Sequence, residues 1–192
     1  MNKFLLKFLN VTPRKPDDIK IVMGGLRDSG KSMILSHLAY KGESATIPTP
    51  AFNKEKFKYR TRTIHLWDLS CHETRRFFFW DNLAVGAKGL IYVADSSEED
   101  LLPESKTELD RILNLDTLKS IPLLVYANKF DKKEIEPEPL ARQLGLFNIK
   151  DREWFVQPSN TLDRTGLYEG LDWLLGAIKK QEIKEGHQKI EA

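Results

Sequence analysis

One eight-residue segment constrains the fold of this chain more than any other. Residues 25–32, GLRDSGKS, fit the pattern G-x-x-x-x-G-K-[ST]. They lie between an apolar run at 19–25, IKIVMGG, and a helical pattern at 31–40, KSMILSHLAY. This strand–loop–helix order is the context that a phosphate-binding loop requires. The segment therefore predicts a nucleotide site at the end of a buried strand, although the loop alone does not distinguish ATP from GTP.

The chemistry of such a loop assigns roles to its residues. Backbone N–H groups and the positive end of the following helix would surround the phosphates. The Lys31 ammonium would reach the β- and γ-phosphates, and the Ser32 hydroxyl would bind Mg²⁺. The predicted nucleotide contacts in this loop are Gly25, Arg27, Asp28, Ser29, Gly30, Lys31 and Ser32.

The rest of the chain alternates strands with helices. A hairpin is expected at 52–60 and 61–68, strands at 89–96, 121–129 and 153–159, and helices at about 100–117, 138–146 and 166–185. Such alternation predicts an α/β fold with a mostly parallel sheet and helices on both faces. We expect one domain over 19–182, an N-terminal amphipathic helix and linker at 1–18, and a polar C-terminal tail at 183–192.

A second motif predicts which base is bound. Asn128-Lys129-Phe130-Asp131 follows the apolar run LLVYA, about 97 residues after the loop lysine. A carboxylate at Asp131 could accept hydrogen bonds from guanine N1–H and the 2-amino group, and adenine offers neither donor in that geometry. Asn128 could bond the N7 side, while the aliphatic part of Lys129 lies along the base. Together the two motifs predict guanine nucleotide.

Two more positions could complete a Mg²⁺ site. Thr49 lies in TIPTPAFN, between the first helix and the hairpin, where a loop could fold over the nucleotide. Asp68 ends a predicted strand, a position from which an acid holds Mg²⁺, usually through water. The next residues, Ser70-Cys71-His72, do not predict zinc, because adjacent ligands rarely share one metal and no second Cys or paired His lies nearby.

Bulk properties exclude several classes of protein. The net charge of +2 forms no long basic block, so nucleic acid is not an expected partner. One cysteine excludes an internal disulfide. No apolar run approaches the ~18 residues of a membrane-spanning helix.

In this order, the motifs resemble the Arf/Sar (Arf-like) branch of the Ras-like small GTPases. TIPTPAFN is similar to that branch's first switch, TIPTxGFN, and the similarity extends to GLIYVADS, LLVYANKFD and GLYEGLDWL. The resemblance covers about residues 19–180. It implies a six-stranded sheet with one antiparallel edge strand, binding of GTP or GDP with Mg²⁺, and two loops that order with GTP. A further base-binding loop would lie at Asn160, Thr161 and Leu162, after Ser159.

The second switch departs from the family. Its pattern is W-D-x-G-G-Q, or W-D-x-G-G-H in the Sar group, whereas this chain has Ser70 and Cys71 at the glycines. The second glycine gives its N–H to the γ-phosphate, so a Cβ on Cys71 would crowd that approach. His72 occupies the water-positioning place and is the predicted catalytic residue. Arg27, where the branch usually has Asp, could stabilise γ-phosphate charge or block the attacking water.

Two segments indicate partners. Phe77-Phe78-Phe79-Trp80 resembles an aromatic patch that faces an effector or scaffold protein, with packing under the switch helix as the alternative for some rings. The N-terminal helix, residues 1–10, presents Phe4, Leu5, Phe8 and Leu9 on one face. The resemblance implies reversible membrane contact for this helix; the alternatives are packing on protein or a mitochondrial targeting segment.

The expected function is that of an Arf-like recruitment switch in membrane traffic or organelle organisation, with slow GTPase activity. The expected location is cytoplasmic and peripheral on a membrane, with a mitochondrial location as the alternative. The competing hypothesis is a pseudo-GTPase kept as a structural or adaptor subunit, with nucleotide bound statically or absent. Ser70 and Cys71 favour this second hypothesis, and the intact Lys31, Ser32 and Thr49 oppose it.

Overall fold

The computed structural model describes residues 17–40, 52–69, 80, 82–131 and 136–190. Its sheet has six strands in the order β2-β3-β1-β4-β5-β6. β2 runs antiparallel to β3, and every other neighbouring pair is parallel. The strands are β1 Asp18–Gly24, β2 Phe52–Tyr59, β3 Arg62–Leu69, β4 Gly89–Asp95, β5 Leu123–Asn128 and β6 Trp154–Pro158. This confirms the predicted sheet with one antiparallel edge strand.

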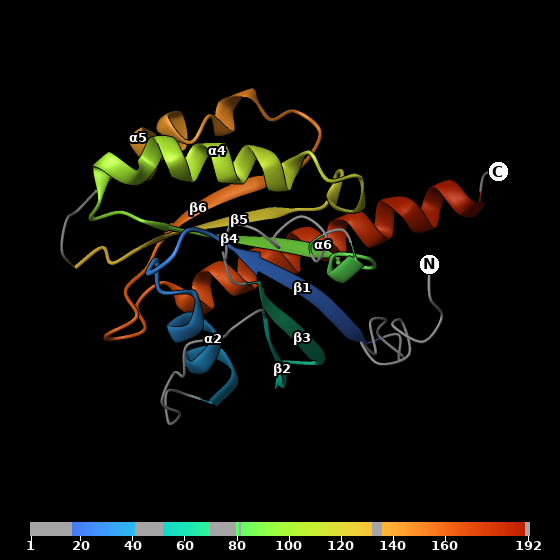
Figure 1. Ribbon diagram of the computed structural model, residues 1–192. Helices are drawn as coiled ribbons and strands as arrows, with labels where there is room; N and C mark the ends of the chain where they lie inside the picture. Colours follow the sequence, from blue (N-terminus) through green and yellow to red (C-terminus); the bar gives the residue numbers. More distant parts are fainter. Residues whose placement is uncertain (1–16, 41–51, 70–79, 81, 132–135, 191–192) are drawn as a thin grey trace.

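Helices cover both faces of the sheet (Figure 1). They are α2 Lys31–Tyr40, α4 Leu102–Leu113, α5 Pro137–Gln143 and α6 Leu167–Ile190, with short 3-10 turns at Glu99–Leu101, Asp116–Leu118 and Leu146–Asn148. α4 and α5 share one buried cluster with the sheet, while α2 and α6 share the other. Because β4 and β5 carry an apolar side chain at nearly every position, they are buried from both sides.

The parallel register brings several carboxyl ends to the same edge. Met23 of β1 lies opposite Asp68 of β3, and Asp95 of β4 lies opposite Asn128 of β5. In open α/β sheets this edge is where ligands bind. The phosphate-binding motif follows β1 directly, so it lies at this edge as well.

Contacts near the turn between β2 and β3 hold this hairpin against α6. The Tyr59 hydroxyl donates to Asp172 at 3.0 Å, and Arg60 also pairs with Asp172. Arg62 pairs with Glu182 at 3.3 Å. These contacts hold the edge of the sheet against the last helix.

Two predicted boundaries differ in the structure. The helix expected at about 100–117 is α4, which ends at Leu113, because Leu115 is extended (φ −71°, ψ 126°) before a separate 3-10 turn. α6 continues to Ile190, through most of the segment predicted as a polar tail. No helix in the described residues is both long and apolar enough to cross a membrane.

Candidate functional site

The phosphate-binding motif forms a tight loop that depends on two glycines. Gly25 has φ +144° and Gly30 has φ +98°, both in the region that side chains rarely adopt. A Cβ on Gly25 would lie 2.3 Å from the carbonyl oxygen of Val93. The loop therefore follows this path only with glycine at both positions.

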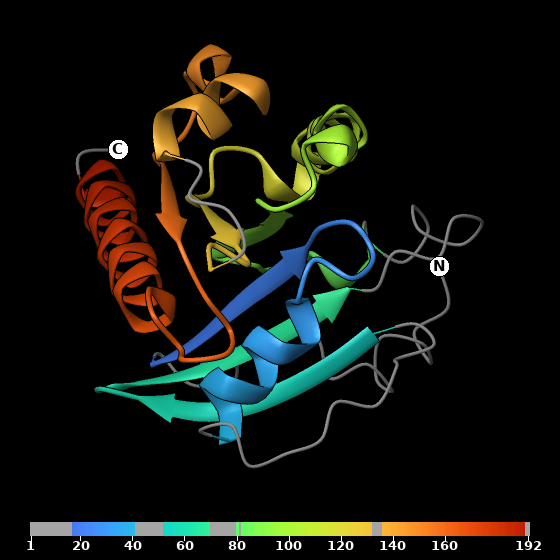
Figure 2. The same cartoon turned by 90° about the vertical axis from the view of Figure 1, so that its left-hand side faces the viewer.

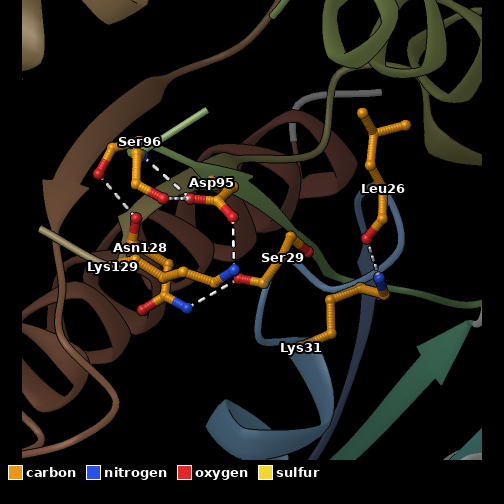
Figure 3. Close-up of polar contacts among 8 residues, drawn as sticks. Leu26, Ser29, Lys31, Asp95, Ser96, Asn128 and Lys129 are labelled. Atoms are coloured by element: carbon orange, nitrogen blue, oxygen red, sulfur yellow. Dashed lines mark hydrogen bonds and ion pairs between the residues drawn. The ribbon is translucent and has the colours of Figure 1, made fainter. Parts of the chain in front are cut away.

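Lys31 lies folded back inside this loop. Its ammonium donates to the carbonyls of Gly25 at 3.0 Å and Leu26 at 2.5 Å. Figure 3 shows the Lys31 side chain directed at Leu26. Ser29 is buried and its hydroxyl has no hydrogen-bond partner among the described residues. Arg27 and Asp28 are exposed, and Asp28 has φ +57°.

Asn128 joins the phosphate loop to the end of β5. Its amide donates to the carbonyl of Ser29 at 2.8 Å, across 99 positions of sequence. Its side-chain oxygen accepts from the Ser159 hydroxyl at 3.3 Å, and its carbonyl accepts from the Ser96 hydroxyl at 2.7 Å. The structure therefore brings three separate sequence segments onto one fully buried asparagine. Figure 3 shows Asn128 with Ser29 and Ser96.

Lys129 is held beside this junction by an acid that the sequence analysis did not select. Its ammonium lies 2.5 Å from the Asp95 carboxylate, at the end of β4. Burial raises the pKa of Asp95, but Lys129 and two hydrogen bonds from Ser97 outweigh it, so the pKa is lowered overall. Asp95 therefore stays charged and holds the Lys129 ammonium in place. The Lys129 backbone is itself in the left-handed region, with φ +61°. The sequence feature that could have identified Asp95 is its position at the end of a predicted parallel strand.

Asp131, the predicted base selector, is exposed in the turn after β5. The Ser159 to Leu162 loop lies next to this turn, because the N–H of Phe130 donates to the carbonyl of Ser159 at 3.2 Å. The Asn160 side chain accepts from the N–H of Leu162 at 2.8 Å. Thr161 is buried, whereas Leu162 is 77% exposed. The two predicted base-binding segments are therefore neighbours.

The predicted Mg²⁺ ligands Ser32 and Asp68 lie together. The Ser32 hydroxyl donates to one Asp68 oxygen at 2.8 Å, while the other oxygen is buried without a partner among the described residues. Burial raises the pKa of Asp68, and nearby Lys31 and the Ser32 hydrogen bond act in the opposite direction. A buried carboxylate oxygen with a free lone pair fits a hydrated Mg²⁺, so these residues could hold the ion.

Several predicted residues fall outside the described part of the chain. They are Thr49, Cys71, His72, Phe77 to Phe79 and the helix of residues 1–10. Trp80 is described, and it is not part of a surface patch. Its side chain is 4% exposed and belongs to the core against Gly24 of β1. Its inclusion in the predicted partner-binding patch was wrong, because this ring packs under the sheet.

Comparison with known proteins matches the sequence of this chain to one family. The model of the ADP-ribosylation factor family matches residues 5–178. The chain is 35% identical to ADP-ribosylation factor K of Dictyostelium discoideum over 165 residues, covering 85% of this chain and 87% of that protein. It is 39% identical to ADP-ribosylation factor D of the same organism over 161 residues, covering 83% of this chain and 74% of that protein.

Proposed function

This chain belongs to the ADP-ribosylation factor family, and we propose that it binds GTP or GDP with Mg²⁺ as a nucleotide-gated recruitment switch. It would act in membrane traffic or organelle organisation. The observation that carries the nucleotide site is Asn128, whose amide binds the Ser29 carbonyl of the phosphate loop. A phosphate site and a base site linked in this way bind the two ends of one nucleotide.

Each part of the nucleotide then has a protein group assigned to it. The N–H groups of the phosphate loop and the Lys31 ammonium bind the phosphates. Asp131 accepts from the N1–H and 2-amino groups of guanine, and the N–H of Thr161 donates to its O6. The Lys129 stem, fixed by Asp95 at 2.5 Å, lies along the base. Ser32 and Asp68, 2.8 Å apart, hold Mg²⁺ together with Thr49.

Hydrolysis would proceed by in-line attack of water on the γ-phosphate. His72 would orient the water, and Lys31 would stabilise the charge that develops on the phosphate oxygens. Bound Mg²⁺ would offset further charge on those oxygens. Small GTPases are slow without an activating partner, so we expect slow turnover for the chain alone.

The Asp131→Asn variant tests the base assignment. It keeps one acceptor oxygen but replaces the other by an NH2 donor, so one of the two hydrogen bonds from guanine is lost, and hydrogen bonds to charged groups contribute about 1.5–3 kcal/mol. GTP should therefore bind about 10- to 100-fold more weakly. Xanthosine triphosphate has a carbonyl in place of the 2-amino group, so the new amide should improve its binding. Titration of both nucleotides measures this, and unchanged GTP affinity would refute the selector role of Asp131.

The competing proposal is a pseudo-GTPase that serves as a structural or adaptor subunit. The replacement of both second-switch glycines by Ser70 and Cys71 favours it. Single-turnover hydrolysis of bound GTP by the wild type and by His72→Ala separates the two proposals. A wild-type rate well above that of the variant supports the switch. Equal rates near zero support the pseudo-GTPase.

Partners and location follow from the same proposal. We infer that effector or scaffold proteins bind through the switch segments and Phe77 to Phe79, and that residues 1–10 make reversible membrane contact. A variant that lacks residues 1–10 should lose sedimentation with membranes and keep its nucleotide. Import of the full chain into isolated mitochondria would instead support the mitochondrial alternative.

A further inference from the structure

A cavity lies at the amino ends of β5 and β6, beside α6. Its volume is about 410 Å³, within the range of about 300–1,000 Å³ that is usual for small-molecule sites. The phosphate and base segments lie at the carboxyl ends of the strands, so this cavity is a separate site. We call it the amino-end cavity, and its described lining residues are Ser120, Pro122, Lys150, Asp151, Arg152, Glu153, Ala177, Gln181 and Lys184.

Three segments that are distant in sequence build the amino-end cavity. Ser120, with φ +62°, and Pro122 precede β5, and residues 150–153 precede β6. The N–H of Leu123 donates to the carbonyl of Glu153 at 3.0 Å, which holds these two segments together. The third segment is α6, whose Lys180 pairs with Glu153 at 3.3 Å. The sheet register and the packing of α6 therefore define the shape of the cavity.

Arg152 is the most deeply placed charge in this lining. Its side chain is 3% exposed. Its Nε and Nη2 atoms donate to Asp151 at 3.2 and 2.9 Å, and its Nη1 donates to the carbonyl of Leu118 at 2.9 Å. A guanidinium has five N–H donors, so these bonds leave two N–H groups for a further acceptor. A buried guanidinium with spare donors favours a ligand that carries acidic oxygens.

Both acids of the lining already have cationic partners. Asp151 pairs with Arg152 at 2.9 Å, and Glu153 pairs with Lys180. The hydrogen bond from Arg152 lowers the pKa of Asp151, and the backbone N–H of Ser120 acts in the same direction, against the opposing effect of burial. Asp151 therefore stays charged and keeps the guanidinium in place.

The two lysines of the lining have no such partner. Lys150 and Lys184 are exposed, and neither forms an ion pair within the part of the chain that the structure describes. One further acid, Glu185, accepts from Gln181 of the lining at 2.9 Å. The cations among the lining residues and their bonded partners still exceed the acids. The cations are Lys150, Arg152, Lys180 and Lys184, and the acids are Asp151, Glu153 and Glu185.

We propose that the amino-end cavity binds a small soluble phosphomonoester, the phosphate of a polyol or sugar. A phosphomonoester carries about −1.5 to −2 charge at pH 7 and has three acceptor oxygens that point in different directions. The cations of the lining likewise come from different sides, with Lys150 and Arg152 before β6 and Lys184 on α6. A carboxylate has two oxygens in one plane, so it would satisfy fewer of these donors.

The remaining lining residues indicate the body of the ligand. Small-molecule pockets are usually lined mainly by apolar side chains. Here Pro122 and Ala177 are apolar, and the other described lining residues are polar or charged. The Ser120 hydroxyl and the Gln181 amide can form hydrogen bonds with ligand hydroxyls, while the two apolar residues contact C–H groups. This combination fits a polyol or sugar.

A phosphate in a lipid headgroup fits the cavity less well than a soluble one. The Arg152 side chain is 3% exposed, so a phosphate must enter the cavity to reach its spare donors. A headgroup at the plane of a bilayer is held outside such a cavity, whereas a free molecule can enter it completely. The source of the phosphate is therefore one object of the test.

The test titrates the full chain with β-glycerophosphate by isothermal calorimetry. The wild type should bind β-glycerophosphate, and glycerol should not bind. A Lys150→Gln/Lys184→Gln variant removes two exposed charges and should bind about 2- to 30-fold more weakly. The matched control is Lys58→Gln/Lys88→Gln, which removes two exposed lysines outside this lining and should bind as the wild type does. Arg152 is left unchanged because it also holds the carbonyl of Leu118.

Two competition experiments locate the phosphate. Excess GDP with Mg²⁺ should not displace β-glycerophosphate, because the phosphate loop lies at the other end of the strands. Sedimentation with phosphatidic acid vesicles, whose headgroup is also a phosphomonoester, should be equal for the wild type and for Lys150→Gln/Lys184→Gln.

Four results would overturn the proposal. They are no binding of β-glycerophosphate to the wild type, equal binding by the two double variants, displacement by GDP, and a dependence on Lys150 and Lys184 that appears with vesicles alone. The proposal does not depend on guanine nucleotide binding. A chain that binds β-glycerophosphate in the amino-end cavity and fails to bind GDP would remove the switch and leave this site intact.

Discussion

At the scale of single residues, Lys20 carries a charge at a position that usually holds an apolar side chain. Its ammonium is buried between Trp67 and the carbonyl of Val85, to which it donates at 2.9 Å. Burial, with a smaller effect from Lys54, lowers its pKa from 10.5 to about 8. Between these values the folded chain binds fewer protons than the unfolded chain, so the free energy of unfolding rises with pH. Below about pH 8 the cost of the buried charge is fully present.

The variant Lys20→Met should therefore be more stable than the wild type at pH 7, by about 1–3 kcal/mol. The difference should shrink as the pH rises from about 8 to 10.5. Urea unfolding at several pH values measures it, and Lys58→Met provides a control at an exposed lysine. A constant difference across the pH range would contradict the role assigned to the Lys20 charge.

Asp68 is a carboxylate whose pKa is also shifted by burial. Burial raises its pKa, so the folded chain binds more protons than the unfolded chain as the pH rises above the usual value of 3.8. Its charge thus lowers the free energy of unfolding at neutral pH unless a cation binds. In a chelator, Asp68→Asn should be more stable than the wild type by about 1 kcal/mol.

Adding Mg²⁺ should reverse that order, because only the wild type keeps the carboxylate that would hold the ion. Thermal unfolding with chelator and with Mg²⁺ measures both states. Asp100→Asn, which changes an exposed carboxylate, should respond to Mg²⁺ as the wild type does. An equal Mg²⁺ response in the Asp68 variant would remove this residue from the metal site.

At the scale of elements, the backbone conformation of the phosphate loop and the position of Asn128 at the end of β5 constrain each other. A Cβ on Gly30 would lie 2.1 Å from the Asn128 amide nitrogen, in a backbone conformation with φ +98°. Gly30→Ala should therefore displace Asn128 from Ser29 and weaken nucleotide binding by about 10- to 100-fold.

Gly86→Ala is the matched control for this substitution. Gly86 also has a positive φ, +75°, but a Cβ there meets nothing within 4 Å. It should lower the free energy of unfolding by about 1 kcal/mol and leave nucleotide affinity unchanged. Equal loss of affinity in the two variants would show that backbone strain, rather than the Asn128 contact, is responsible.

The elements that could be predicted from sequence are those whose signals are local. The strand of β1, the loop of 25–32 and the helix that begins at Lys31 are adjacent in the chain, so their spacing defines them. The antiparallel hairpin was predicted correctly, since two β-rich runs lie only two residues apart. The phosphate and base segments are contiguous motifs, and their placement at strand ends followed from the parallel sheet.

The features that sequence reasoning missed are set by packing between distant segments. The ion pair of Asp95 with Lys129 requires β4 and β5 to be neighbours in register. The four aromatic residues at 77–80 do not reveal which ring packs inward, and Trp80 does so against β1. The break after Leu113 depends on the extended backbone of Leu115, whose side chain packs against the core.

At the scale of the whole molecule, the proposed nucleotide site lies at the carboxyl ends of strands β1, β3, β4 and β5. A ligand that binds only the folded state stabilises it by RT ln(1 + [L]/Kd), about 2.7 kcal/mol at a hundredfold excess over Kd. Adding Mg²⁺ and GDP to the chain freed of nucleotide should raise the unfolding midpoint accordingly. Thermal unfolding against GDP concentration measures this, with ADP as the control. An equal response to ADP would contradict guanine selectivity.

The hydrogen bond between Asn128 and Ser29 also orders events during biosynthesis. The phosphate loop leaves the ribosome first; its partner Asn128 follows 99 positions after Ser29, and Ser159, which donates to the Asn128 side chain, follows 130 positions after Ser29. At about 5–20 residues per second, the loop waits roughly 6–26 s for Ser159 to be added. On the proposed site assignment, a nascent chain lacks the base-binding segments during that interval and should not retain guanine nucleotide. Nucleotide would then act as a late check on synthesis, retained only by chains that have been translated beyond β6.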